Sequence, residues 1–120
     1  ELAYAKQNNI PFAKLKNKSG NYVAPSIDGT TAAANGAVNH MPPDFKVMIT
    51  NASGEAAYPI CGFSWAVVRV NQTGENGKAL VDLLNWMMDN GNDQVADLYY
   101  APFPASLVKK IKAAIATIKY

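Results

Sequence analysis

The run Phe-Ser-Trp-Ala-Val-Val-Arg-Val at residues 63–70 constrains the fold more than any other feature of the chain. Alternate residues of this run are apolar on both sides, so we expect a strand that is covered on both faces. Such a strand, combined with amphipathic helices, belongs to a layered α/β sheet, which has about five or six strands. The rest of the chain offers only short strands. We therefore expect the sheet to be completed by sequence outside these 120 residues or by a second copy of the chain.

Local signals predict a helix, a hairpin and a short strand in the first part of the chain. Residues 1–9 have an apolar side with helical spacing. Two extended runs, residues 10–17 and 21–25, flank a turn that contains Gly20, which is typical of a hairpin. Residues 45–50 place apolar Phe45, Val47 and Ile49 on one side and predict a short strand.

Three further helices are predicted from capping and breaking residues. Ser26 or Asp28 can cap an Ala-rich helix, which Asn35-Gly36 is expected to end or break. Residues 78–91 form an amphipathic helix with Gly91 as its stop, and Pro104 begins the last helix, where its missing N–H is not needed. The buried stripe of that last helix is expected to contain Val108, Ile111, Ile115 and Ile118.

The sequence offers several isolated reactive side chains but no set that builds a catalytic site. Residues 62–66 nearly match the nucleophile elbow around Ser64, but Ala66 replaces the second glycine and the strand follows the serine instead of preceding it. The single histidine, His40, lies upstream in a loop with two prolines. Cys61 has no neighbouring base, so we expect it to pack as a small apolar residue. We predict no catalytic residue and no enzyme.

Charge and ligand counts exclude other classes of protein. The net charge is +2, and no basic stripe with interleaved aromatic residues is present, so nucleic acid is not an expected partner. One histidine and one cysteine cannot supply the usual ligands of a zinc site, and we predict neither a metal nor a cofactor. Asp89, Asp93 and Asp97 are expected to be solvated surface residues.

The first residues suggest that the chain belongs to something longer. It opens directly on a predicted helix, with no Ser, Thr, Asp or Asn ahead of it to act as a cap. We therefore expect the chain to be a fragment or a processed product.

Four segments of the sequence, taken in order, carry a family resemblance. They are the opening "ELAYAKQNNIPFAKLKNKSGNYVAPS", then "AYPICGFSWAVVRV", "GKALVDLLNWMMDNG" and "ADLYYAPFPASLVKKIKAA". In this order they resemble the C-terminal part of the periplasmic phosphate-binding proteins of bacterial phosphate ABC transporters. The resemblance extends over essentially all 120 residues.

The resemblance implies a fold and a division of the chain. The family has the two-lobed type II periplasmic-binding-protein fold, in which each lobe is an α/β sheet. Residues 1–57 would supply a helix, a hairpin, a helix and a strand that finish the second lobe. Residues 58–120 would return to the first lobe and complete it with a strand and helices. Ala57, Tyr58 and Pro59 would then lie at the crossover or hinge between the lobes.

The resemblance also implies a ligand and partners. Proteins of this kind capture inorganic phosphate between the lobes and deliver it to a membrane permease, outside the cytoplasm of a bacterium. The loops that contact phosphate precede the first residue of this chain, so we expect no ligand-binding residue here, and Arg69 is not assigned to the anion. The expected structural partner is the missing N-terminal portion or a second copy of the chain. The alternative is a self-associating structural module derived from the same fold.

Overall fold

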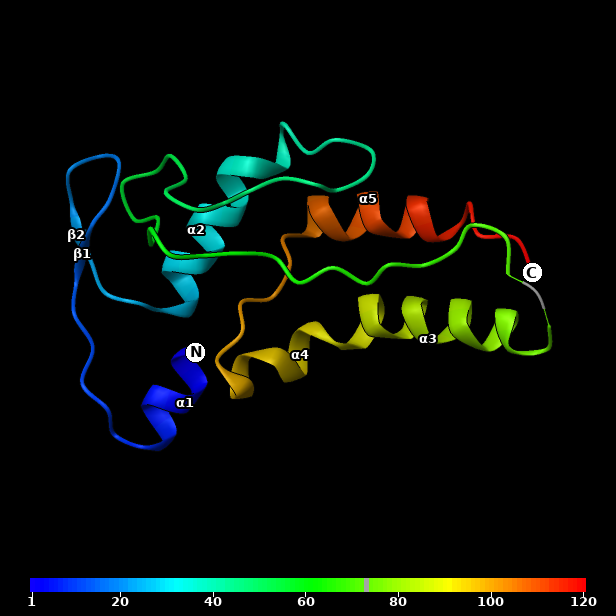
Figure 1. The fold of residues 1–120 in the computed structure, drawn as a ribbon, viewed down its shortest axis with the longest axis horizontal. Coiled ribbons are helices and arrows are strands. Elements are labelled where there is room, and N and C mark those ends of the chain that lie inside the picture. The colour runs from blue at the N-terminus through cyan, green and yellow to red at the C-terminus, as the bar shows by residue number, and fades with distance from the viewer. Residues whose placement is uncertain (73) are drawn as a thin grey trace.

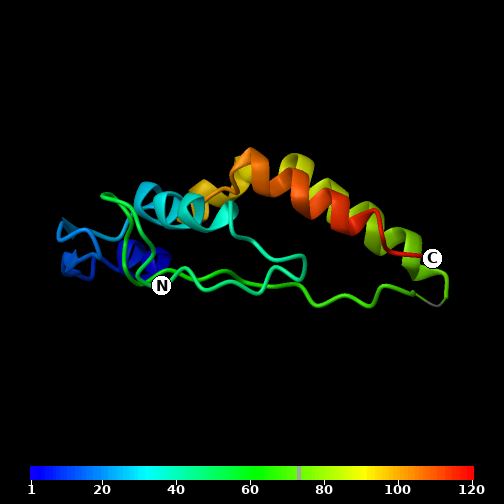
Figure 2. The same ribbon diagram turned by 90° about the horizontal axis from the view of Figure 1, so that it is seen from above.

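The structure is a computed structural model that describes residues 1–72 and 74–120, and it is elongated and flat, with extents of 49 × 33 × 19 Å (Figures 1 and 2). Helices dominate it, and its one sheet has two strands. The elements, in order, are α1 (Leu2–Gln7), β1 (Leu15–Lys16), β2 (Tyr22–Val23), α2 (Ile27–Val38), α3 (Asn76–Asn90), α4 (Asn92–Val95), the 3-10 helix η1 (Ala96–Leu98) and α5 (Ala105–Ile115).

The predicted hairpin is confirmed, although its strands are short. β1 and β2 pair antiparallel, with Leu15 opposite Val23 and Lys16 opposite Tyr22. Gly20 lies in the turn with φ +90°, a conformation that glycine adopts without steric cost.

Helix α2 begins as predicted but ends later than predicted. The Ser26 side chain accepts a hydrogen bond from the backbone N–H of Gly29 at 3.0 Å, which makes Ser26 the cap. The expected break at Asn35-Gly36 is wrong, because the helix continues to Val38. Packing explains the glycine instead, since a Cβ on Gly36 would lie 2.9 Å from the carbonyl oxygen of Ser53.

A small buried cluster lies on α2, in addition to the buried Val81, Leu107 and Ile115 of α3 and α5. Ala34 and Ala37 of α2 surround Ile49, which is 1% exposed. Partly buried side chains from the segments before and after residues 53–60 pack against this cluster: Val47, Ala52, Cys61 and Phe63. The cluster therefore joins α2 to the two extended segments that follow it.

The short strand predicted at residues 45–50 and the long strand predicted at residues 63–70 do not form in the described part of the chain. Residues 45–50 and 63–70 are extended or irregular and belong to no sheet. Val67 is 98% exposed and Trp65 is 48% exposed, whereas the alternation predicted burial on both faces. The segment that contains them runs along one side of the molecule, with helices α3 and α5 on the other side (Figure 2). An apolar strand without neighbouring strands has nothing to pair with or to bury its faces.

Helices α3 and α5 lie side by side and run in opposite directions (Figure 1). α3 ends at Gly91 as predicted, and Pro104 immediately precedes α5. In α5, Ile115 is buried and Val108 and Ile111 are partly buried, while Leu107, which the predicted stripe omitted, is 2% exposed. Ile118 is partly buried but lies beyond the end of α5, so its predicted place in the helix is wrong. Among the described residues, no helix combines the length and apolar character needed to cross a bilayer.

Candidate functional site

The predicted crossover, Ala57 to Pro59, is held against the residues that precede it. Ala57 is fully buried and its N–H donates to the carbonyl of Gly54 at 3.2 Å. The N–H of Tyr58 donates to the carbonyl of Gly29 in α2 at 3.0 Å, and the carbonyl of Pro59 accepts from the N–H of Asn51 at 2.7 Å. Tyr58 and Pro59 thus each have a backbone hydrogen bond to the N-terminal segment, by which we mean residues 1–57, and Ala57 is bonded within that segment.

Asn17 fixes the approach to the crossover. Its side chain is only 6% exposed, and it is a buried polar residue that the sequence did not single out. Its amide nitrogen donates to three carbonyl oxygens, those of Gly54 at 3.2 Å, Glu55 at 2.8 Å and Ala57 at 3.2 Å. Its amide oxygen accepts from two N–H groups of the hairpin turn, those of Ser19 at 3.1 Å and Asn21 at 3.0 Å. One side chain therefore ties the hairpin turn to the turn that leads into the crossover.

Beyond Pro59 the chain is held more loosely. Ile60 is 69% exposed, and a Cβ on Gly62 would meet nothing within 4 Å. Between them, the thiol of Cys61 donates to the hydroxyl of Thr30 at 3.6 Å. Burial raises the pKa of the Cys61 thiol, which lowers its thiolate fraction and opposes a nucleophilic role.

An open cavity of about 430 Å³ lies between the N-terminal segment and the C-terminal segment, by which we mean residues 58–120. Its walls come from α1, the start of α2, the crossover and residues 98–101. Aromatic residues contribute much of the lining: Phe12, Tyr58, Tyr99 and Tyr100. The two segments therefore meet here around a hollow and not through a packed apolar interface.

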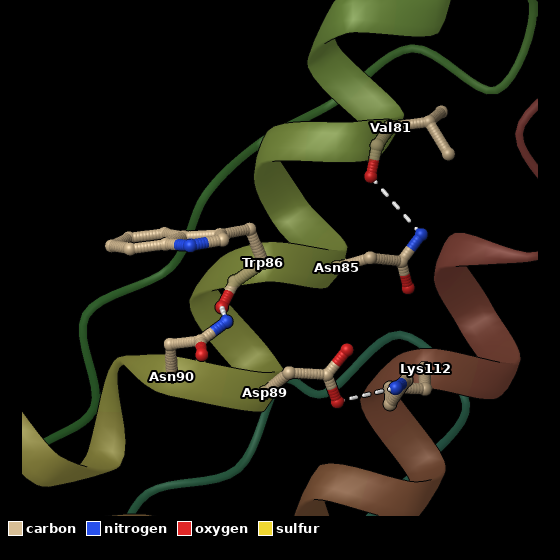
Figure 3. A network of polar contacts seen from close by, with 6 residues as sticks. All are labelled: Val81, Asn85, Trp86, Asp89, Asn90 and Lys112. Carbon is tan, nitrogen blue, oxygen red and sulfur yellow. Dashed lines mark hydrogen bonds and ion pairs between the residues drawn. The ribbon is translucent and has the colours of Figure 1, made fainter.

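The other candidate side chains lie on the surface. Ser64, His40 and Arg69 are exposed, and none of their side chains forms a hydrogen bond or ion pair within the described residues. Asp89 accepts a hydrogen bond from the Lys112 ammonium at 2.6 Å, which joins α3 to α5 (Figure 3). Asp93 and Asp97 are exposed, as predicted. This leaves the crossover and its anchors as the candidate site, with an architectural role.

Comparison with known proteins covers nearly the whole chain. No family model matches it. It is 42% identical over 115 residues to the phosphate-binding protein PstS of Xylella fastidiosa strain 9a5c, an alignment that covers 94% of this chain and 31% of that protein. The chain is related to the PstS phosphate-binding proteins. PstS of Haemophilus influenzae is 34% identical over 94% of this chain, and PstS of Methanocaldococcus jannaschii is 38% identical over 76% of it.

The match to PstS confirms the resemblance that the sequence motifs carry. The chain spans about a third of the length of the curated PstS relatives, and it matches their C-terminal part. Because 94% of the chain is aligned with PstS of Xylella fastidiosa, most of both segments belongs to the shared region.

Proposed function

We propose that this chain is the C-terminal part of a solute-binding protein that captures inorganic phosphate and delivers it to the membrane permease of an ABC transporter. The observation that carries the proposal is the 42% identity to a PstS phosphate-binding protein over 94% of the chain. On this proposal the protein works outside the cytoplasm of a bacterium and is not an enzyme. The chain contributes architecture to it, and the phosphate contacts come from the residues upstream.

The proposed architecture divides the chain at the crossover. The N-terminal segment finishes one lobe of a two-lobed protein, and the C-terminal segment returns to the other lobe. The anchoring of Ala57, Tyr58 and Pro59 to the N-terminal segment supports this division, because it fixes these residues to that lobe. Exposed Ile60 and unobstructed Gly62, immediately downstream, leave room for the chain to bend.

The C-terminal segment leaves backbone groups unpaired and apolar side chains exposed, as expected for part of an incomplete sheet. Within the described residues, the backbone groups of residues 62–68 form no hydrogen bonds, so both edges of this extended segment are open to pairing. Helix α3 presents apolar side chains to solvent as well: Leu83 at 53%, Trp86 at 51% and Met87 at 46% exposed. Trp86 points away from α5 (Figure 3). The upstream two thirds of the PstS relatives has the length to supply the strands that would cover both.

Arg69 and the start of α2 do not form an anion site. Phosphate sites use arginine forks, helix N-termini or nests of backbone N–H groups. The only arginine of the chain, Arg69, is exposed, and the Ser26 side chain already occupies the N–H of Gly29 at the start of α2. These observations support a phosphate site that lies outside the chain.

Calorimetric titration with phosphate tests the placement of the site. The 120-residue chain alone should release no binding heat at micromolar phosphate. A mixture of the chain with the upstream two thirds of a PstS relative should bind phosphate. Micromolar binding by the chain alone would refute the placement of the phosphate site upstream. A mixture that forms a complex without binding phosphate would refute the proposal that the chain is part of a phosphate-binding protein.

One observation favours self-association as a second candidate function. Residues 56–68 contain no charged side chain, and the open edges at residues 62–68 lack the lysines and prolines that usually protect edge strands. Two copies could pair through this segment. Sedimentation over a range of concentrations would then show a reversible dimer that Val67→Lys abolishes, and a monomer at all concentrations would exclude it.

A further inference from the structure

Five side-chain hydrogen bonds connect the N-terminal segment to the C-terminal segment in the described part of the chain. Three of them lie near the crossover and involve Cys61 or Trp65: Cys61 to Thr30, Thr50 to the carbonyl of Cys61, and Trp65 to the carbonyl of Phe45. The other two lie far from it in sequence and join Lys110 to Val38 and Tyr100 to Glu1. Bonds remote from a pivot determine the angle between two bodies more strongly than bonds at the pivot.

Lys110 supplies a charge that α2 lacks. The last turn of α2 contains no basic residue, although a helix C-terminus carries a partial negative charge and free carbonyls. The ammonium of Lys110, from α5, donates to the carbonyl of Val38, the last residue of α2, at 2.8 Å, and this contact is partly buried. One cation thus completes a helix that belongs to the other segment.

Tyr100 makes the second remote contact at the wall of the 430 Å³ cavity. Its hydroxyl donates to a carboxylate oxygen of Glu1 at 2.8 Å. The hydrogen bond to Glu1 raises the pKa of Tyr100, because the carboxylate favours the protonated phenol. Both residues line the cavity, so this bond spans the hollow between the segments.

We propose that Lys110 and Tyr100 form a polar latch that holds the two segments in the observed arrangement, and that breaking these two bonds lets the segments rotate about the crossover. The contacts are single, polar and at least partly solvent-accessible, so water can reach each partner when the bond breaks. The cavity leaves room for the movement. The apolar contacts of Cys61 and Phe63 with the α2 cluster lie within a few residues of the crossover, so they belong to the pivot and not to the remote contacts.

The inference rests on the proposed division of the chain at residues 57–59. In a two-lobed binding protein, the latch would bias the equilibrium between two arrangements of the lobes and thereby the apparent affinity for the ligand. Its test needs no phosphate, so its failure is distinguishable from failure of the proposed phosphate function.

Distances between two spin labels in the 120-residue chain test the latch. The labels replace exposed Lys18 in the hairpin turn and exposed Gln94 in α4, in a Cys61→Ser background that keeps a donor toward Thr30. The unmodified latch should give one narrow distance distribution. Lys110→Met should add a second, broader distance distribution. The ratio of the two populations should change about tenfold in its favour, as expected for the loss of a charged hydrogen bond.

Matched variants separate the latch from general damage. Tyr100→Phe removes one hydroxyl and should broaden the distribution without changing the helix content by circular dichroism. Lys110→Arg keeps the cation and should stay narrow, as should Lys109→Met, which changes an exposed neighbour on the same helix. If Lys110→Met fails to fold, Tyr100→Phe decides alone. A narrow, unshifted distribution in folded Tyr100→Phe and Lys110→Met overturns the proposal, and so does equal broadening in Lys109→Met.

Discussion

Replacing Asn17 by alanine should be among the most damaging single changes to a polar residue of this chain. The substitution removes an amide that donates to three carbonyls and accepts from two N–H groups. A neutral hydrogen bond contributes about 1 kcal/mol net, and a buried group left without a partner costs about 1–3 kcal/mol. The bond to the Ala57 carbonyl is buried, whereas the other four are partly buried and water can partly replace them. We therefore expect a loss of about 2–4 kcal/mol in the free energy of unfolding.

Urea unfolding followed by circular dichroism measures this loss, which corresponds to about 10 °C in Tm for a chain of this size. The matched control is Asn21→Ala, which gives up one exposed side-chain bond to the Glu55 carbonyl at 3.1 Å and should cost less than about 1 kcal/mol. Asn17→Asp should be at least as damaging as Asn17→Ala, because it places a carboxylate oxygen against the three carbonyls. A loss for Asn17→Ala no larger than that for Asn21→Ala would refute the reasoning.

Four further changes test other parts of the account. Ser26→Ala removes the α2 cap and should cost about 1 kcal/mol in urea unfolding, whereas Ser26→Asp should be nearly neutral. Gly36→Ala should cost about 1–3 kcal/mol, because its Cβ would lie 2.9 Å from the Ser53 carbonyl. Lys112→Met breaks the exposed pair with Asp89 and should cost less than about 1 kcal/mol, a difference that 1 M salt should reduce. Val67→Lys should leave the unfolding of the 120-residue chain unchanged, since the side chain is 98% exposed, yet prevent assembly with an upstream PstS portion.

Local signals predicted much of the secondary structure because their causes are local. Gly20 marks the hairpin turn and Ser26 caps α2, and each works through neighbours a few residues away. The packing reason for Gly36 within α2 was not predictable, because it lies in the close approach of Ser53, a residue distant in the sequence.

The prediction for residues 63–70 failed because burial of a strand depends on its neighbours. The apolar pattern predicts a strand covered on both faces, but the described residues supply no neighbouring strands, and Val67 is 98% exposed. The role of Asn17 was equally hidden, because an asparagine before a hairpin turn is common and its three carbonyl partners lie more than 35 residues away. The family was nevertheless identifiable, because the order of the sequence motifs can be read without the contacts that the described residues lack.

Phosphate binding by a reconstituted protein tests the central claim most directly. The chain is mixed with the upstream two thirds of Xylella fastidiosa PstS, the relative to which it is 42% identical, and the purified complex is titrated with phosphate by calorimetry. We predict binding by the complex, none by either piece alone, and none in a mixture that contains Val67→Lys. Phosphate binding by the 120-residue chain alone, or a stable complex that binds none, would contradict the account.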